Sequence, residues 1–236
     1  MTGPSAGSPA GPPAWLRPLV ERVRRVRGEE LSRFLPPEEG GRASAVLMLF
    51  GEDRHGPDLL LIERAATLRT HAGQPAFPGG AIDPDDAGPE AAALREAAEE
   101  TGLDPDGVDV LAALPSLWLP PSGYVVTPVL AWWRRPVPVA PLDVAEVAAV
   151  DRVPVAELVD PANRLRVRHP SGYAGAAFRV RGMLVWGFTA GLLDRLIALA
   201  GWERPWDRSR VEELPGPPAV PVGDAPAPEE PRGPTR

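Results

Sequence analysis

The segment from Pro89 to Gly102 constrains the fold of this chain more than any other part of its sequence. Proline suits the first turn of a helix and glycine suits its end, so the order PEAAALREAAEETG predicts one helix between them. At about 100° per residue, Glu96, Glu99 and Glu100 share roughly a third of the helix circumference. The helix therefore gathers three carboxylates on one face.

The opposite side of this helix carries small or apolar side chains, on which we expect it to pack: Ala91, Leu94, Ala98 and Thr101. Residues 83–106 hold nine carboxylates and one basic residue, Arg95. Glu96 and Glu100 are four residues apart, so they repel each other when both are charged. A solvated acidic face is the ordinary explanation of such a pattern. A hard divalent cation bound through oxygen ligands accounts for it better.

Two glycines, Gly79 and Gly80, precede the helix directly after Pro78. Because glycine has no side chain, the backbone here can approach a metal ion or a phosphate closely. A Gly-Gly pair alone usually marks a plain turn, but its position before the acidic helix makes it part of a candidate site. Magnesium or manganese fits carboxylate ligands, whereas zinc prefers nitrogen or sulfur.

The composition excludes several classes of function. The net charge of the 236-residue chain is -7, which disfavours nonspecific binding to nucleic acid or an anionic membrane. All 25 basic residues are arginine, whose planar guanidinium suits the phosphates of a small ligand. The absence of cysteine excludes disulfides, thiolate catalysis and zinc–cysteine sites.

The two ends of the chain differ from its middle. Residues 1–13 and 215–236 are rich in proline, glycine and alanine and are predicted to be disordered tails, with one folded domain over 14–214. We find no signal-peptide pattern and no apolar stretch near the roughly 18–20 residues that span a bilayer. We therefore expect a cytoplasmic protein without a membrane partner. A homodimer is compatible with the sequence but not indicated by it.

The domain alternates between strand and helix patterns. Strands are predicted at 43–50, 58–63, 108–119, 124–133, 144–153, 164–169 and 176–180. Helices are predicted at 15–26, 89–101, 154–159 and 188–200, and a long loop at 66–88. This order predicts an α/β fold in which helices cover both faces of a mixed sheet.

The acidic helix and the glycines before it resemble a known family signature. Arg95-Glu96-Ala97-Ala98-Glu99-Glu100-Thr101-Gly102-Leu103 is similar to the second half of the Nudix box, Arg-Glu-aliphatic-any-Glu-Glu-any-Gly-aliphatic. The first half departs, because Arg95 lies one residue too far from Gly80 and Asp86 stands in place of the first glutamate. The resemblance implies the Nudix fold, an α-β-α sandwich around a mixed β-sheet.

The segment before the box narrows the resemblance. Residues 60–83, LLIERAATLRTHAGQPAFPGGAID, are similar to the coenzyme A pyrophosphatase branch through Leu-Arg-any-His-any-Gly at 68–73 and Phe-Pro-Gly-Gly at 77–80. That branch also tolerates the longer box. Ala65 departs from it, since serine is usual there. Residues 122–128 and 186–190 are similar to further features of the branch.

The resemblance implies metal-dependent hydrolysis of a diphosphate. Coenzyme A would give adenosine 3′,5′-bisphosphate and 4′-phosphopantetheine, and Mg²⁺ or Mn²⁺ would be held by Glu96, Glu99 and Glu100. We expect Glu96, Glu99 and Arg95 to be catalytic. The general base is left open between a box glutamate and an acid of a distant loop, such as Asp143 or Glu146.

The residues expected to bind the nucleotide substrate lie upstream of the helix: Arg64, Arg69, His71, Gly79 and Gly80. The two arginines and the histidine are placed to clamp phosphate oxygens. Each has an ordinary alternative, a surface charge for Arg64 and a hydrogen bond to loop backbone for His71. The tryptophans of the predicted strands are expected to pack in the core instead of stacking on a base.

Other functions fit the same motif. The nearest is a Nudix hydrolase for ADP-ribose, a dinucleotide or a nonstandard nucleoside triphosphate. Another is a regulatory Nudix module that binds a nucleotide without cleaving it, although such modules usually have degenerate boxes and this one keeps all three glutamates. A protein that binds partners through its proline-rich tails is the third alternative.

Overall fold

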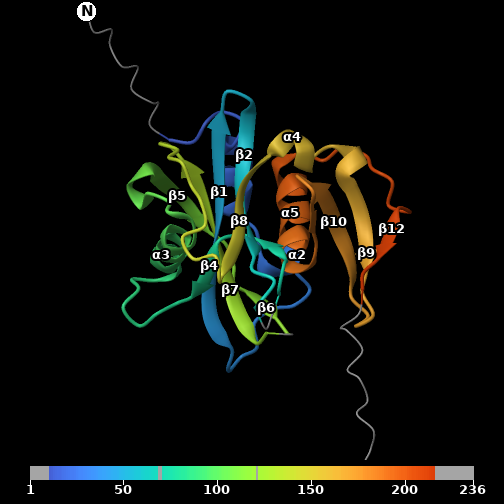
Figure 1. Ribbon diagram of the computed structural model, residues 1–236, viewed down its shortest axis with the longest axis horizontal. Helices are drawn as coiled ribbons and strands as arrows, with labels where there is room; N and C mark the ends of the chain where they lie inside the picture. Colours follow the sequence, from blue (N-terminus) through green and yellow to red (C-terminus); the bar gives the residue numbers. More distant parts are fainter. Residues whose placement is uncertain (1–10, 69–70, 121, 216–236) are drawn as a thin grey trace, which may run out of the picture.

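The computed structural model describes residues 11–68, 71–120 and 122–215 (Figure 1). Its helices in these ranges are α1 (Arg17–Val23), α2 (Gly28–Leu31), α3 (Pro89–Thr101), η1 (Pro105–Gly107), α4 (Val155–Leu158), η2 (Pro161–Asn163) and α5 (Gly187–Ala200). Its strands are β1 (Arg42–Asp53), β2 (Gly56–Arg64), β3 (Pro75–Ala76), β4 (Gly79–Ala81), β5 (Val108–Ala113), β6 (Leu117–Leu119), β7 (Tyr124–Trp133), β8 (Val147–Pro154), β9 (Arg164–Arg168), β10 (Ala174–Val180), β11 (Met183–Val185) and β12 (Val211–Glu213).

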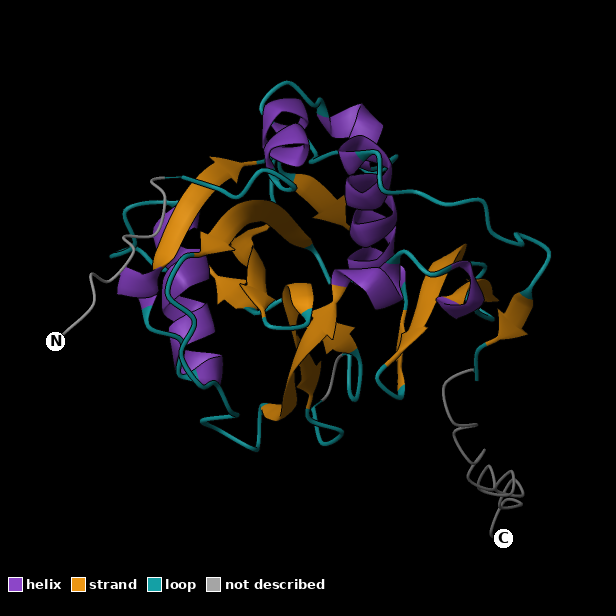
Figure 2. Ribbon diagram, turned by 90° about the horizontal axis from the view of Figure 1, so that it is seen from above, coloured by secondary structure: helices purple, strands orange, loops and turns teal. Residues whose placement is uncertain are grey.

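These strands form two sheets (Figure 2). The larger has eight strands in the order β3-β2-β1-β7-β5, with β4 paired to β1, β6 to β7 and β8 to β2. The smaller has the order β11-β10-β9-β12. Strand β1 runs parallel to β7 and antiparallel to β2 and β4, so the larger sheet is mixed, as predicted.

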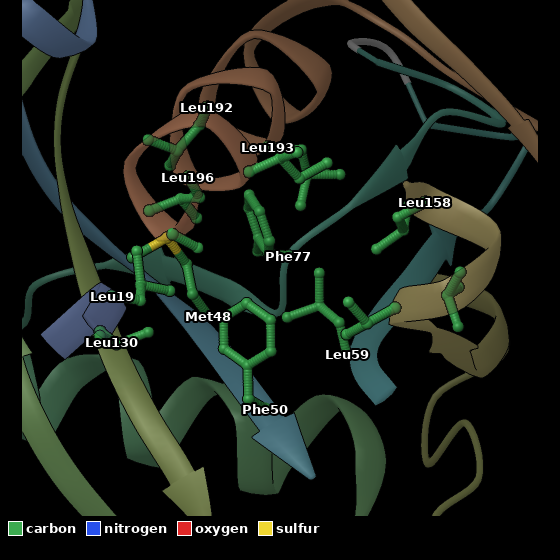
Figure 3. Close-up of a cluster of buried hydrophobic side chains, with 14 of the residues drawn as sticks. Leu19, Met48, Phe50, Leu59, Phe77, Leu130, Leu158, Leu192, Leu193 and Leu196 are labelled. Carbon is green, nitrogen blue, oxygen red and sulfur yellow. The ribbon is translucent and has the colours of Figure 1, made fainter. Parts of the chain in front are cut away.

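The central strand β1 is buried on both faces. Leu47 and Leu49 join a cluster beneath α3, whereas Met48 and Phe50 join the cluster that α1 and α5 cover. Successive side chains of a strand point to opposite faces, so this alternation fixes which helix packs on which side. Figure 3 shows Met48 and Phe50 with Phe77 under the leucines of α5. The predicted α-β-α layering is confirmed.

Some predicted elements are wrong. The strand expected over 108–119 is divided into β5 and β6, because Pro115 between them has no backbone N–H to give to the sheet. The loop expected over 66–88 contains the short strands β3 and β4, which pair with β2 and β1. Strands β11 and β12, which complete the smaller sheet, and helix α2 were not predicted.

The predicted tails fall largely outside the described residues, in 1–10 and 216–236. At the N-terminal boundary, the carbonyl oxygen of Pro13 accepts the backbone N–H groups of Leu16 and Arg17. Within the described ranges, no helix combines the length and hydropathy needed to cross a bilayer.

Candidate active site

Helix α3 begins and ends where the sequence predicts. Pro89 lies at its first turn after Gly88, whose φ of 137° is accessible to glycine. Gly102 caps the other end at a φ of 71°, and its N–H donates to the carbonyl oxygen of Ala98. These two glycines fix the length of the helix and therefore the direction in which each glutamate points.

The buried face of α3 differs from the prediction. Its buried residues are Ala92, Ala93, Ala97, Glu100 and Thr101. Of the residues expected to pack, Thr101 is buried and Leu94 packs against the cluster beneath α3, whereas Ala91 and Ala98 are half-buried. The expectation that the carboxylates turn away from the packed face is wrong for Glu100. Glu100 lies inside the packed face and is 8% exposed.

Gly79 and Gly80 make room for these carboxylates. Both belong to β4, opposite Val46 and Ala45 of β1. A Cβ atom on Gly79 would overlap the carbonyl oxygen of Ala45, and one on Gly80 would overlap the carboxylate of Glu96. The backbone N–H of Gly79 donates to Glu100 Oε2 at 2.9 Å. The structure therefore brings the glycine pair together with two of the box glutamates.

Burial makes these two glutamates unusual acids. Burial, together with the smaller effect of the charge of Glu96, raises the pKa of Glu100 to about 7 against the lowering effect of the Gly79 N–H. Burial also raises the pKa of Glu96, while Arg95 acts in the opposite direction. Two carboxylates held together away from water repel each other. A bound cation would offset this repulsion.

Arg95 ties the helix to the loop before it. Its Nε and Nη2 atoms donate to the two carboxylate oxygens of Asp86 at 3.1 and 3.0 Å, and Nη2 also donates to the carbonyl oxygen of Ala81 at 3.0 Å. The guanidinium lowers the pKa of Asp86. Asp86 thus binds Arg95 although it is one carbon shorter than the glutamate of the usual pattern. Arg95 holds other residues in position in this geometry, which differs from the catalytic role expected for it.

The third box glutamate is far more exposed than the other two. The side chain of Glu99 is 60% exposed and pairs with Arg95 Nη1 at 3.0 Å, and the same nitrogen lies 3.2 Å from Glu96. Across the described ranges, no three acidic or histidine side chains converge closely enough to enclose a metal ion. The donors nevertheless fit a hard divalent cation, because the carboxylates of Glu96 and Glu100 lie against Gly80 and Gly79. Neither glycine has a side chain that would keep an ion away from these carboxylates. Glu99 shares Arg95 Nη1 with Glu96, so it lies next to one of these donors.

The structure places the predicted substrate-binding residues Arg64 and His71 in different surroundings. Arg64 ends β2, its positive charge lowers the pKa of Glu100, and its buried Nε atom has no hydrogen-bond partner in the described ranges. His71 lies on the exposed loop at a φ of 55°, and its Nδ1 atom is 3.0 Å from Gln74 Oε1. Arg69 lies outside the described residues. Of the two described residues, Arg64 is therefore the one whose charge acts on Glu100.

The loop between β7 and β8 brings a further acid toward Glu100. The carbonyl oxygen of Glu146 accepts the N–H of Ala65 at 2.8 Å, which fixes this end of the loop next to Arg64. The negative charge of Glu146 also raises the pKa of Glu100. Asp143 instead accepts the N–H of Ala145 at 2.8 Å and closes a turn. Of these two distant acids, Glu146 is the one whose charge acts on Glu100.

Two features of the site were missed from the sequence. The side chain of Gln74 is the hydrogen-bond partner of His71. The backbone carbonyl oxygen of Gln74 accepts the N–H of Arg64 at 3.1 Å, so Gln74 joins the two ends of the loop that follows β2. The three-residue spacing from His71 to Gln74 is the signal that could have indicated this pair. The carbonyl oxygen of Ala81, which Arg95 binds, has no signature in the sequence because it belongs to the backbone.

Tryptophans and surface hollows lie outside this site. Trp133 is fully buried, and Trp132 and Trp186 pack against buried clusters, as expected. The described surface has two open hollows. Pro136 and Arg152 are among the residues that line the first, and Trp15 and Trp202 are among those that line the second. The α3 glutamates line neither hollow, so the candidate site is defined by its side chains and not by an enclosed cavity.

Comparison with known proteins decides the family. The family described as NUDIX domain matches residues 41–174, more than half of the chain, and this range contains the whole α3 site. The chain belongs to the Nudix family. Its Nudix domain therefore begins with β1 and extends into the smaller sheet, whereas α5 and β12 lie beyond the matched range.

Named relatives support the same family. The chain is 45% identical over 159 residues to an uncharacterized Nudix hydrolase NudL of Cronobacter sakazakii, covering 64% of this chain and 79% of the relative. It is 39% identical over 190 residues to the protein of that name in Citrobacter koseri, covering 72% and 93%. A Nudix hydrolase structure from M. smegmatis, RenU, aligns with a TM-score of 0.47 and 22% identity over 74% of this chain and 98% of that one. The family match and the two NudL relatives make the protein a Nudix hydrolase, a member of an enzyme family that generally uses divalent metal ions.

Proposed function

We propose that this Nudix hydrolase cleaves the diphosphate bond of coenzyme A and its derivatives, giving adenosine 3′,5′-bisphosphate and 4′-phosphopantetheine or its acyl derivative. The observation that carries the proposal is the packing of the buried Glu100 and the partly buried Glu96 against Gly79 and Gly80, with Arg64 near enough for its charge to lower the pKa of Glu100. The loop over 66–74, similar in sequence to the coenzyme A pyrophosphatase branch, leads directly into this site.

The chain's own residues have separate tasks in this reaction. Arg64 supplies positive charge to phosphate oxygens, in a place where burial strengthens its attraction. Glu96, Glu99 and Glu100 would hold Mg²⁺ or Mn²⁺, which neutralises charge on the diphosphate and makes water a better acid. Arg95 and Asp86 keep the helix and the glycine strand in register, so that these groups meet the same diphosphate.

We assign the general base to Glu146. Water attacks one phosphorus atom, its proton passes to a carboxylate, and the bond from that phosphorus to the bridging oxygen breaks. Glu146 is exposed to solvent, and its loop is fixed beside Arg64 by the hydrogen bond from Ala65. Glu100 is a poorer candidate, because its carboxylate is buried and already accepts the Gly79 N–H.

Hydrolysis by the purified protein tests the proposal. Incubation with coenzyme A and Mg²⁺ or Mn²⁺ should yield the two named products, identified by mass. Glu96→Gln and Glu100→Gln should each remove most turnover while the circular dichroism spectrum stays unchanged. Glu90→Gln is the matched control, because Glu90 is an exposed glutamate in the first turn of the same helix.

A substrate panel separates this proposal from its rivals. ADP-ribose, diadenosine polyphosphates and nucleoside triphosphates carry the same kind of phosphate linkage without pantetheine. Faster hydrolysis of any of these than of coenzyme A would reassign the substrate and leave the metal site intact. Binding without hydrolysis of any member of the panel would show a regulatory module and refute catalysis.

A further inference from the structure

The loop that follows β2 folds back on Arg64 through backbone hydrogen bonds. The N–H of Gly73 donates to the carbonyl oxygen of Arg64 at 3.0 Å, and the N–H of Arg64 donates to the carbonyl oxygen of Gln74 at 3.1 Å. Strand β3 begins at the next residue and pairs with β2. Gln74 is therefore tied directly to Arg64, the residue whose charge acts on Glu100.

Gln74 also binds His71 in two places. The N–H of Gln74 donates to the carbonyl oxygen of His71 at 3.2 Å, and His71 Nδ1 lies 3.0 Å from Gln74 Oε1. The φ of His71 is 55°, a left-handed conformation that is uncommon in residues with a Cβ atom. Such a conformation persists where the surrounding contacts hold it, and it is frequent at functional sites. Gln74 thus holds His71 and connects it to Arg64.

The side-chain hydrogen bond fixes which nitrogen of the neutral imidazole carries the proton. Gln74 Oε1 is a carbonyl oxygen and can only accept, so Nδ1 of His71 is the donor. A neutral imidazole has one proton for its two nitrogens, so Nε2 is left as an acceptor. An acceptor binds a hydroxyl or an N–H group and not a phosphate oxygen. Neutral His71 therefore suits a different part of the substrate from Arg64.

We propose that Gln74 is a positioning residue, which presents Nε2 of neutral His71 to a hydroxyl or N–H group of the substrate. The side chain of Gln74 orients the ring and sets its tautomer, and its backbone ties the ring to Arg64, which binds the diphosphate. His71 then recognises a group beside the diphosphate and adds a selectivity that the charge of Arg64 alone does not give. This inference rests on the proposed function, because it requires a substrate bound at Arg64.

Nitrogen-15 NMR of the purified protein tests the tautomer without any substrate. At about pH 8, where an imidazole is ordinarily neutral, His71 should carry its proton on Nδ1. Gln74→Leu should move this proton to Nε2, the form that a free histidine side chain prefers. His71→Ala assigns the signal among the three histidines of the chain. His169 is the internal control, because its Nδ1 atom accepts the N–H of Ser171 at 3.1 Å and the proton of its neutral ring is therefore on Nε2 in every sample.

Steady-state hydrolysis of coenzyme A tests whether Gln74 acts through His71. His71→Ala and Gln74→Leu should each raise KM roughly tenfold with little change in kcat, the scale of one hydrogen bond lost from ground state and transition state alike. The double variant should be no worse than His71→Ala alone, because Gln74 then has no ring to position. His55→Ala is the matched control, since His55 is exposed in the turn between β1 and β2 and its loss should leave KM unchanged.

Each contrary result overturns a different part of the inference. A His71 proton on Nε2 in the wild type, or a tautomer that Gln74→Leu does not change, refutes the positioning role. Additive losses in the double variant refute it as well, because Gln74 then acts by another route. A wild-type enzyme that cleaves no coenzyme A refutes the proposed function, and the substrate contact of His71 with it, whereas the tautomer result is unaffected. If Gln74→Leu loses its circular dichroism spectrum, Gln74→Met repeats both measurements.

Discussion

Glu100 combines two properties that rarely occur together in a glutamate. It is 8% exposed, and its hydrogen-bond partner is a backbone N–H instead of a cationic side chain. Burial therefore raises its pKa to about 7, so the folded protein binds a proton that the unfolded chain releases. The folded state is fully stabilised by this proton below the ordinary glutamate pKa of 4.5, and the stabilisation is lost as the pH rises toward 7.

Replacing this carboxyl with an amide should therefore stabilise the metal-free protein at alkaline pH. In EDTA at pH 8, Glu100→Gln should raise the free energy of unfolding by up to about 3 kcal/mol, since a shift of one pKa unit corresponds to about 1.4 kcal/mol. At pH 4 the gain should vanish. Urea unfolding at the two pH values measures this, with Glu90→Gln as control. A variant less stable than the wild type at pH 8 would show that the carboxylate is not destabilising.

The two neighbouring glycines should respond differently to the same substitution. A Cβ on Gly79 would overlap backbone atoms of Ala45 and Val46, which cannot move aside, so Gly79→Ala should destabilise the fold by about 3 kcal/mol. A Cβ on Gly80 would meet only the end of the flexible Glu96 side chain, so Gly80→Ala should keep the fold and lose activity.

Thermal unfolding and turnover, measured on the same samples, distinguish these two outcomes. Gly191→Ala is the control, because Gly191 lies in a helix with open space around it, and alanine there should stabilise the protein by about 1 kcal/mol. Equal loss of stability at Gly79 and Gly80 would contradict the assigned contacts.

At the scale of elements, the sequence predicts the helices and strands whose bounds are set by residues close to them in the chain. Pro89 and Gly102 set the bounds of α3, and the apolar run over 124–133 gives β7 correctly. The burial of Glu100 in the packed face of α3 was not predicted, because helical periodicity contains no information about the glycine strand that admits its side chain. Strands β3 and β4 were missed because their pairing partners lie in β2 and β1, far along the chain.

The Asp86–Arg95 pair joins the loop after β4 to α3 and so controls how these two elements fit. Asp86→Asn should lower the melting temperature and reduce turnover roughly tenfold, because a small displacement of catalytic groups is costly. The adjacent, exposed Asp85→Asn should change neither quantity. Asp86→Glu, which restores the residue of the usual box, should retain activity. Full activity of Asp86→Asn would show that the other partners of Arg95, which include the carbonyl oxygen of Ala81 and the carboxylate of Glu99, position it without Asp86.

At the scale of the whole molecule, the site is assembled from four separate stretches of chain. Arg64, Gly79 and Gly80, the α3 glutamates and Glu146 meet only because β2 pairs with β8 while β4 pairs with β1. The box glutamates were predictable from their spacing. Our proposal of Glu146 over Asp143 needed the structure, because the two acids lie three residues apart and their sequence contexts do not distinguish them.

A buried ion pair links the smaller sheet to the rest of the fold. Arg164 of β9 is 1% exposed, pairs with Asp194 of α5, and lies between the rings of Phe178 and Trp206 at 4.9 and 4.7 Å from their centroids. Its Nε and Nη1 atoms have no partner in the described ranges. The cation therefore depends on a single carboxylate for compensation of its charge.

Substituting either partner of this ion pair should lower the free energy of unfolding, but by different amounts. Asp194→Ala leaves a buried cation unpaired and should lower the free energy of unfolding by about 3 kcal/mol. Arg164→Met removes the charge together with its two unsatisfied donors and keeps an apolar contact with both rings, so it should cost less than half as much. Urea unfolding of the two variants and of their combination measures the asymmetry. If Arg164→Met were the more damaging substitution, the guanidinium would stabilise the fold through its ring contacts more than its charge costs.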